Sequence, residues 1–267
     1  MRIAGLERSS FVDYPGKLAA VLFTPGCNLD CFYCHNRHLL SPGEKDQVYD
    51  PQDVLRFLRS RVGLLEGVVV TGGEPTLQKD LEPFLAEIHS MGFAVKLDTN
   101  GTQPWVVQPL IEKGIVDFVA MDVKAPRNRY DEIAGKPVDI HAIEESVKRL
   151  MTGGVDYEFR TTFAPQLTAL DIVTIATWIH GAKRYVLQQY RPPGLGVDMF
   201  GLVDFPRPRP PEYIAQTAML VRRFVKHIEV RGLGVEANLL SAPSPSIVKG
   251  ESKSPARGAY NLTSHIS

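Results

Sequence analysis

Cysteine is scarce in this sequence, and its three cysteines all lie between positions 27 and 34. Because no distant cysteine is available to cross-link a second segment, a disulfide-stabilised fold is excluded. Cysteines that lie so close together in a reducing compartment are instead typical of metal ligands. The pattern therefore indicates one short loop as the place where this protein holds a metal centre.

The sequence also lacks an excess of charge of either sign, since 30 basic residues are matched by 30 acidic residues. A balanced chain gives no indication of nucleic acid or an anionic membrane as a partner. The longest apolar runs, such as residues 18–23, have the length of a strand and are too short to span a bilayer. Met1 leads directly into the sequence of a folded domain, without a signal peptide. We therefore expect a cytoplasmic protein that binds neither nucleic acid nor a membrane.

Short apolar runs alternate with amphipathic stretches from residue 17 to about residue 190. This alternation is typical of parallel strands joined by right-handed helical crossovers. The predicted strands are residues 19–24, 68–71, 93–98, 118–122, 157–163 and 185–189, and the predicted helices lie near residues 52–61, 80–91, 104–114, 141–152 and 169–180. Six such units fall short of the eight in a closed barrel. We therefore expect an α/β fold, an open partial (β/α)6 barrel, with a doubly wound sheet as the alternative.

The composition changes near residue 235. Residues 241–267 contain seven serines and three prolines and show little apolar periodicity. This composition is typical of a solvated segment that does not fold on its own. We expect a core domain of residues 1–234 and a poorly ordered tail of residues 235–267, with a docking segment for a partner as the alternative.

The loop that contains the cysteines reads GCNLDCFYCHN from residue 26 to residue 36. Its cysteines, Cys27, Cys31 and Cys34, are separated by three and then by two residues. This spacing lets one loop reach three irons of a [4Fe–4S] cluster, and the fourth iron is then open to bind a substrate. The alternative is a zinc site of three cysteines and one histidine, either His35 or His38, although a structural zinc site seldom draws every cysteine from one loop.

A second motif, TGGEP at residues 71–75, follows a predicted strand. Gly72 and Gly73 let the backbone approach a ligand closely, and Glu74 can accept hydrogen bonds from an ammonium group. Taken alone, the motif is also compatible with an ordinary turn. Polar segments close or lie within four further predicted strands, and such strand ends meet at one edge of a parallel sheet. These segments are DTNG at 98–101, DVKAP at 122–126, RTT at 160–162 and QQYR at 188–191.

Alternation within the predicted strands places charged side chains on the inner face of the sheet. Glu158 and Arg160 share one face of strand 157–163, and Lys96 and Asp98 share a face in the same way. An isolated buried charge costs several kcal/mol, so these groups must be paired or must bind something. An ion pair between Glu158 and Arg160 is the alternative to ligand binding.

The cysteine spacing, together with the residues that follow it, resembles the signature of the radical S-adenosylmethionine superfamily. The resemblance implies one [4Fe–4S] cluster on Cys27, Cys31 and Cys34, with S-adenosylmethionine as the second cofactor. The segment at residues 72–75 resembles the Gly-Gly-Glu segment that holds the amino group of this cofactor. This implies that Gly72, Gly73, Glu74 and Pro75 belong to the cofactor site.

Within this superfamily the sequence resembles the glycyl-radical-enzyme activases, especially those that serve anaerobic ribonucleoside-triphosphate reductases. The resemblance covers residues 3–232 and rests on FVDYPGK at 11–17, YCHN at 33–36 and DTNG at 98–101. Arg191 departs from it, since relatives often have a histidine there. The chain also lacks a cysteine-rich ferredoxin insert, so one cluster is expected. The resemblance implies that Tyr33 and His35 contact the adenosyl moiety, that Asp98 and Thr99 lie beside the ribose or a nearby cation, and that Asn100, Lys124 and Arg160 complete the cofactor site.

The mechanism implied by the resemblance begins with a flavodoxin- or ferredoxin-type donor that reduces the cluster. S-adenosylmethionine is then cleaved to methionine and a 5′-deoxyadenosyl radical, which abstracts hydrogen from the Cα of a glycine in a partner. The expected partner is a glycyl radical enzyme similar to anaerobic ribonucleotide reductase.

Two other functions remain open. One is a radical enzyme similar to the 7-carboxy-7-deazaguanine synthases, with Glu158, Arg160 and Gln189 around a small substrate. The other is an iron–sulfur or zinc module without catalytic activity. The connections at residues 71–80 and 98–104 are short and leave little chain for a lid, which favours a peptide loop as the substrate.

Overall fold

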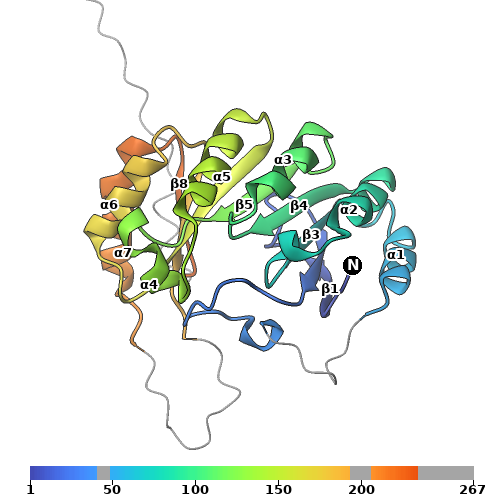
Figure 1. Cartoon of the computed structure of the whole chain (residues 1–267), viewed down its shortest axis with the longest axis horizontal. Helices are drawn as coiled ribbons and strands as arrows, with labels where there is room; N and C mark the ends of the chain where they lie inside the picture. Colours follow the sequence, from blue (N-terminus) through green and yellow to red (C-terminus); the bar gives the residue numbers. More distant parts are fainter. Residues whose placement is uncertain (41–48, 193–205, 234–267) are drawn as a thin grey trace, which may run out of the picture.

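The computed structural model describes residues 1–40, 49–192 and 206–233, which form one eight-stranded sheet covered by helices (Figure 1). The strands follow one another across the sheet in chain order. The first pair is antiparallel and every later pair is parallel. The strands are β1 (Gly5–Ser10), β2 (Ala19–Thr24), β3 (Gly67–Gly72), β4 (Ala94–Thr99), β5 (Phe118–Asp122), β6 (Asp156–Phe163), β7 (Tyr185–Gln189) and β8 (Ile228–Arg231).

The six predicted strands correspond to β2 through β7, and their bounds differ from the prediction by at most one residue. The chain-order arrangement has no point at which the strand order reverses, so the sheet is an open barrel and not a doubly wound sheet. The sequence pattern does not predict β1 and β8, the two edges of the sheet. They read GLERSS and IEVR, without the continuous apolar run of a central strand, because edge strands are only partly covered.

Helices connect the parallel strands, and several begin at capping residues. Asp50 accepts a hydrogen bond from the backbone amide of Gln52 at the start of α1, and Thr168 and Asp171 form a capping box at the start of α6. The helices are α1 (Pro51–Arg59), α2 (Leu81–Ser90), α3 (Pro104–Glu112), α4 (Tyr130–Ala134), α5 (Ile140–Thr152), α6 (Ala169–Trp178) and α7 (Pro211–Val221), with short 3-10 turns η1 (Arg37–Leu39), η2 (Pro75–Leu77), η3 (Arg127–Arg129) and η4 (Arg222–Phe224). Five of the helices were expected, whereas α4 and α7 were not.

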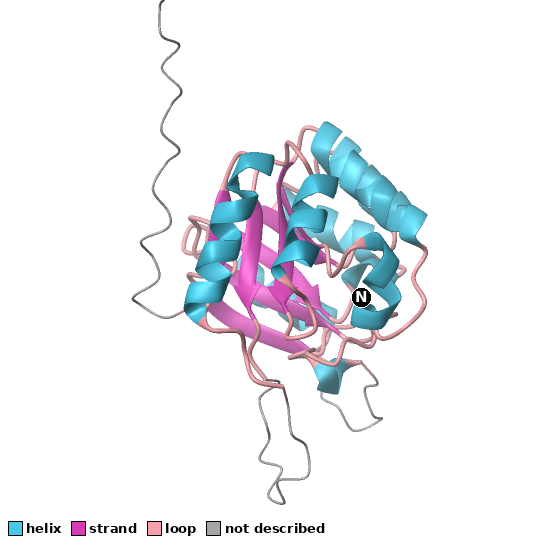
Figure 2. Cartoon of the chain, turned by 90° about the vertical axis from the view of Figure 1, so that its left-hand side faces the viewer, coloured by secondary structure: helices cyan, strands magenta, loops and turns pink. Residues whose placement is uncertain are grey.

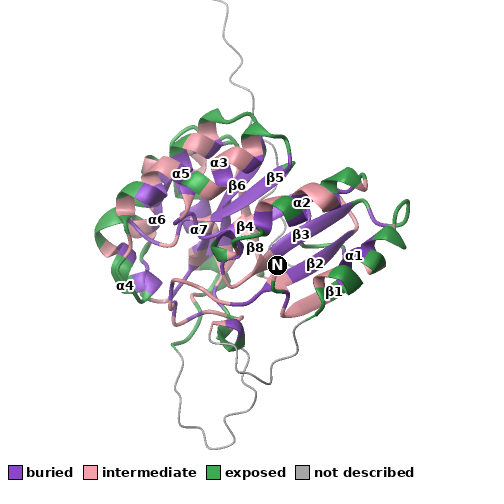
Figure 3. Ribbon diagram, turned by 45° about the vertical axis from the view of Figure 1, so that its right-hand side comes forward, coloured by how far each residue is buried: buried purple, intermediate pink, exposed green. Residues whose placement is uncertain are grey.

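The outer face of the sheet packs against the helices, which are arranged around the strands (Figure 2). Val70, Leu97 and Met121, from three neighbouring strands, are fully buried on this face. Buried residues follow the strands and the inward sides of the helices (Figure 3). Within the described ranges, no helix is long and apolar enough to cross a bilayer.

The inner face of the sheet changes character along the strands. Near the amino-terminal ends of the parallel strands it is apolar, and the rings of Tyr14 and Phe118 lie 6.0 Å apart beside Val21 and Val69. Toward the carboxyl ends it carries charged and polar side chains. The register places Asp122 beside Arg160 and Thr162 beside Gln188 on this part of the face. The fold therefore collects its polar inner side chains at the carboxyl ends of the strands, as predicted.

The two edges of the sheet approach each other across an opening. A cavity of about 740 Å³ is lined by Phe11 and Val12, from the connection between β1 and β2, and by Glu229 and Arg231 of β8. Because both edges line one cavity, the sheet curves as a partial barrel does. The predicted tail and the segments 41–48 and 193–205 lie outside the described residues.

Candidate active site

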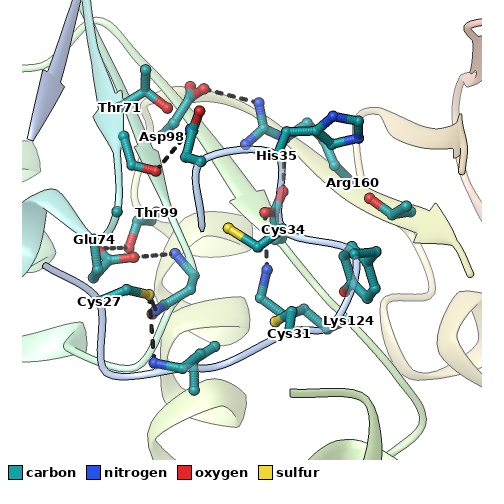
Figure 4. Close-up of a pocket in the computed structure, with 18 of the residues that line it drawn as sticks. Cys27, Cys31, Cys34, His35, Thr71, Glu74, Asp98, Thr99, Lys124 and Arg160 are labelled. Atoms are coloured by element: carbon teal, nitrogen blue, oxygen red, sulfur yellow. Dashed lines mark hydrogen bonds and ion pairs between the residues drawn. The ribbon is translucent and has the colours of Figure 1, made fainter. Parts of the chain in front are cut away.

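The three cysteines follow β2 and line one cavity of about 240 Å³ at the carboxyl ends of the strands (Figure 4). Neighbouring elements hold their loop in place. The backbone amide of Asp30 donates to the carbonyl of Ala134 over 2.9 Å, and Nδ2 of Asn36 donates to the carbonyl of Gly72 over 3.0 Å. The loop is thus fixed on one side by the end of α4 and on the other by the end of β3.

Burial raises the pKa of the Cys27 and Cys34 thiols above their ordinary value. The free thiols are therefore protonated near neutral pH, and a metal centre that binds thiolates must displace these protons. Of the two histidines considered for zinc, His35 lines the cavity, whereas His38 is exposed and does not.

The turn at residues 72–75 packs directly on the cysteine loop. The backbone amide of Glu74 donates to the carbonyl of Gly26 over 2.8 Å. A Cβ atom at Gly73 would lie 2.0 Å from that same carbonyl oxygen, and Gly72 has a φ of 117°. Side chains at these positions would push the two segments apart, so both glycines are required for the cavity to form.

Glu74 lines the cavity, and the hydrogen bonds recorded for its carboxylate come from groups of the protein itself. The side chain is fully buried. Oε1 accepts hydrogen bonds from the backbone and hydroxyl of Thr76 and from the hydroxyl of Thr99, and Oε2 accepts one from the backbone amide of Asn100 over 2.6 Å. Burial raises the pKa of Glu74, although these hydrogen bonds oppose the rise. Glu74 therefore links the turn at residues 72–75 to the end of β4 and so fixes this part of the cavity.

A network of alternating charges crosses the inner face beneath the cavity. Arg160 lies at its centre and donates to Asp98 over 3.0 Å and to Asp122 over 2.9 Å. Lys96 pairs with Asp98, and Lys124 lies 3.2 Å from Asp122. Figure 4 shows Asp98, Lys124 and Arg160 around the same cavity as the cysteines.

Ion pairing keeps this network charged. Burial alone would raise the pKa of Asp98 and Asp122, but the attraction of Arg160 and the neighbouring lysines outweighs it, and the pKa of Asp122 falls to about 2. Burial would likewise lower the pKa of Lys124, yet Asp122 holds it well above the ordinary value. Both acids and Lys124 are therefore ionised near neutral pH.

Glu158 and Arg160 point to the inner face as predicted, but they do not form a pair with each other. Glu158 is fully buried and forms a two-pronged ion pair with Arg231 of β8, with both N–O distances 2.8 Å. Arg184 lies 3.8 Å from the same carboxylate. The alternative of an ion pair between Glu158 and Arg160 is therefore wrong, and the sequence could not reveal Arg231 as the partner because it lies on an edge strand that was not predicted.

The cavity brings together every predicted site residue except Pro75, which is buried at the start of η2. Gln189 is also outside its lining and donates to the carbonyl of Arg209. The lining also includes Asp122, Thr162 and Gln188, which lie in the strand-end segments identified from the sequence but were assigned no role there. Leu29, Asn36 and Thr71 belong to the two motifs, whereas Leu40 lies outside every segment that the sequence singled out.

The profile of the Radical SAM superfamily matches residues 21–179, which include the cysteine loop and most of the cavity. The chain belongs to the radical S-adenosylmethionine superfamily. It is 30% identical over 239 residues to a protein of Methanocaldococcus jannaschii named "Putative glycyl-radical enzyme activating enzyme", covering 86% of this chain and 95% of that protein. It is 29% identical over 145 residues to a 7-carboxy-7-deazaguanine synthase of Koribacter versatilis, covering 52% of this chain and 59% of that enzyme.

The fold of this radical S-adenosylmethionine enzyme is also found in solved structures. Streptococcus suis SuiB bound to S-adenosylmethionine has a TM-score of 0.61 at 15% identity, over 79% of this chain and 52% of that one. The family uses a [4Fe–4S] cluster and S-adenosylmethionine, and the residues of the cavity fit both. Three thiols suit three irons, while the ionised Asp98, Asp122 and Lys124 suit a ligand that carries both an ammonium and a carboxylate group.

Proposed function

We propose that this enzyme installs a glycyl radical on a separate protein, a glycyl radical enzyme of the anaerobic ribonucleotide reductase type. The observation that carries the proposal is the likeness to an activating enzyme over nearly the whole length of that relative. When bound, the cluster and S-adenosylmethionine supply a one-electron reductive cleavage that yields a 5′-deoxyadenosyl radical. A flavodoxin- or ferredoxin-type protein is the proposed electron donor.

The protein's own residues bind and orient these cofactors. Cys27, Cys31 and Cys34 hold the cluster and leave one iron without a protein ligand. The backbone of Gly72 and Gly73 would face S-adenosylmethionine, and Lys124 would attract its carboxylate. Arg160 keeps Asp98 and Asp122 fixed in their ionised form, and Asp98 and Thr99 would lie beside the ribose or a nearby cation. The buried Tyr33 and the exposed His35 would contact the adenosyl moiety.

The opening between the sheet edges supports a macromolecular substrate. Its cavity of about 740 Å³ is lined by side chains that differ from those of the cofactor cavity. Phe11 and Val12 stand at its rim with 81% and 85% of their surface exposed, and Arg184, Arg191 and His227 contribute cationic or polar groups. An exposed apolar pair beside arginines suits a peptide segment of a partner.

The proposal is tested by electron paramagnetic resonance of a mixture of reduced enzyme, S-adenosylmethionine and the ribonucleotide reductase-like protein. A glycine-centred radical on the partner is expected, and it should be absent when the partner's glycine is changed to alanine or when S-adenosylmethionine is omitted. A silent partner together with turnover of a small metabolite would contradict the proposal.

The second candidate is a radical enzyme that acts on a small molecule, favoured by the likeness to a 7-carboxy-7-deazaguanine synthase over part of the chain. Glu158, Arg160 and Gln189 were considered as its substrate ligands. Each of them is bound to other groups of the protein. Glu158 pairs with Arg231, Arg160 pairs with Asp98 and Asp122, and Gln189 donates to the carbonyl of Arg209. These contacts leave the inner face with fewer groups to recognise a small polar substrate, which places this function second.

A further inference from the structure

A closed ring of hydrogen bonds joins the cysteine loop to the segment after β4. Nδ2 of Asn28 donates to the hydroxyl of Thr102 over 2.8 Å. That hydroxyl donates to Oδ1 of Asn100 over 2.7 Å, and Nδ2 of Asn100 donates to Oδ1 of Asn28 over 2.9 Å. Each donor of the ring meets an acceptor, so the three side chains hold one another in place.

The backbone fixes the orientation of the Asn100 amide. The backbone amide of Thr102, which can only donate, points to Oδ1 of Asn100 over 3.0 Å. The atom that receives this hydrogen must be the amide oxygen, so the nitrogen occupies the opposite side. There Nδ2 uses one hydrogen for Asn28, and it lies 3.9 Å from Sγ of Cys27. Asn100 is only 5% exposed, so little water competes for its second hydrogen.

Cys27 receives a hydrogen bond from a second direction as well. The backbone amide of Leu29 lies 3.4 Å from the same sulfur and belongs to the cysteine loop itself. Asn100 reaches the sulfur from the end of another strand, and its backbone amide is bound to Glu74. The residue thus connects the cluster ligand with the carboxylate that holds the turn at residues 72–75.

We propose that Asn100 is a positioning residue that donates a hydrogen bond to the Cys27 thiolate and so raises the reduction potential of the cluster. Reduction adds negative charge to the cluster, and a donor aimed at a ligand sulfur stabilises that charge. Beside the cofactor contact that the resemblance implies for Asn100, the hydrogen bonds of its side chain are directed to Asn28, Thr102 and Cys27. The inference rests on Cys27 as a cluster ligand and is independent of the partner protein.

The test is a redox titration of the cluster-loaded enzyme, followed by electron paramagnetic resonance, without any partner. Asn100→Ala should shift the potential to a more negative value and should change the iron–sulfur stretching bands in the resonance Raman spectrum. Thr102→Val should cause a smaller shift in the same direction, because its backbone amide still holds Asn100 while the hydroxyl is lost. Gln108→Ala removes an amide on α3, outside the lining of the cavity, and should leave the potential unchanged.

A wild-type potential in Asn100→Ala overturns the inference, and so does weaker S-adenosylmethionine binding without a shift in potential. If Asn100→Ala fails to retain a cluster, Thr102→Val decides, and an unchanged potential in that variant overturns the inference. Because no partner is present, failure of the activase assay would not alter the outcome of this titration.

Discussion

The backbone amide of Asn100 donates a 2.6 Å hydrogen bond to Oε2 of Glu74, so a buried carboxylate joins the end of β4 to the turn at residues 72–75. The other carboxylate oxygen accepts from Thr76 and Thr99. The carboxylate of Glu74 thereby holds the two segments together, and Glu74 lines the cavity with Gly72 and Gly73.

Removal of this carboxylate should therefore weaken the fold as well as the cofactor site. In Glu74→Ala the buried amides of Thr76 and Asn100 lose their acceptor, and the free energy of unfolding should fall by about 1–3 kcal/mol for each unpaired donor. Urea unfolding measures the loss, and titration with S-adenosylmethionine measures the accompanying loss of affinity. The matched control is Glu87→Ala, an exposed carboxylate on α2 that pairs with Arg59, which should change stability by less than about 0.5 kcal/mol. Unchanged stability with reduced affinity would mean that Glu74 binds the cofactor directly.

Each cysteine should be required for the cluster. Protein prepared without oxygen should be brown and contain about four irons per chain. Cys27→Ala, Cys31→Ala and Cys34→Ala should each remove most of this iron, because three ligands are already the minimum for a cluster with one open iron. His38→Ala is the control and should retain the iron, since His38 does not line the cavity. Stoichiometric zinc in a colourless, folded protein would contradict the assignment.

The contribution of Asp122 to stability should depend on pH. Burial opposes its ionisation, but Arg160 and Lys124 lower its pKa from 3.8 to about 2 in the folded protein. A carboxylate with a lowered folded pKa stabilises the fold above its unfolded pKa, and this stabilisation is lost as the pH falls toward the folded value. Urea unfolding of wild type and Asp122→Asn should thus differ near pH 6, and the difference should shrink as the pH is lowered from about 4 toward 2. A difference that stays constant over this interval would show that the ion pairs do not stabilise the charge of Asp122.

The opening between the sheet edges should affect the partner more than the cofactors. Replacement of Phe11 and Val12 by serine removes an exposed apolar pair, so activation should require a several-fold higher concentration of partner. The measured quantity is the partner concentration that gives half of the maximal activation rate. It is obtained from the rate of radical formation on the partner at increasing partner concentrations. Trp105→Ser, an exposed aromatic on α3, is the matched control and should leave it unchanged. An equal effect in both variants would place the docking surface elsewhere.

Alternation along single strands was sufficient to predict much of this fold and site. The apolar runs of β2 through β7 are buried on both faces of the sheet at their centres, which makes them easy to identify. The same alternation correctly placed Lys96, Asp98, Glu158 and Arg160 on the inner face. These predictions depend only on the period of a strand, which the local sequence determines.

The partners of these charges could not be predicted in the same way. Glu158 pairs with Arg231, which is 73 positions away on a four-residue edge strand with little apolar signal. Arg160 pairs with Asp122 because the register of β5 and β6 sets the two residues side by side. Two of the donors to Glu74, Thr99 and Asn100, likewise come from the end of a different strand. Partner choice depends on strand order and register, which no single segment contains.

The most direct test of the proposed activity follows the hydrogen atom that leaves the partner. The partner is prepared with glycine deuterated at Cα and is mixed with reduced enzyme and S-adenosylmethionine, and the 5′-deoxyadenosine product is analysed by mass spectrometry. Because the abstracted atom is transferred to the 5′ carbon, the product should gain one deuterium, and a partner whose radical-bearing glycine is changed to alanine should give unlabelled product. Unlabelled 5′-deoxyadenosine from the deuterated wild-type partner would contradict glycyl radical activation as the function of this enzyme.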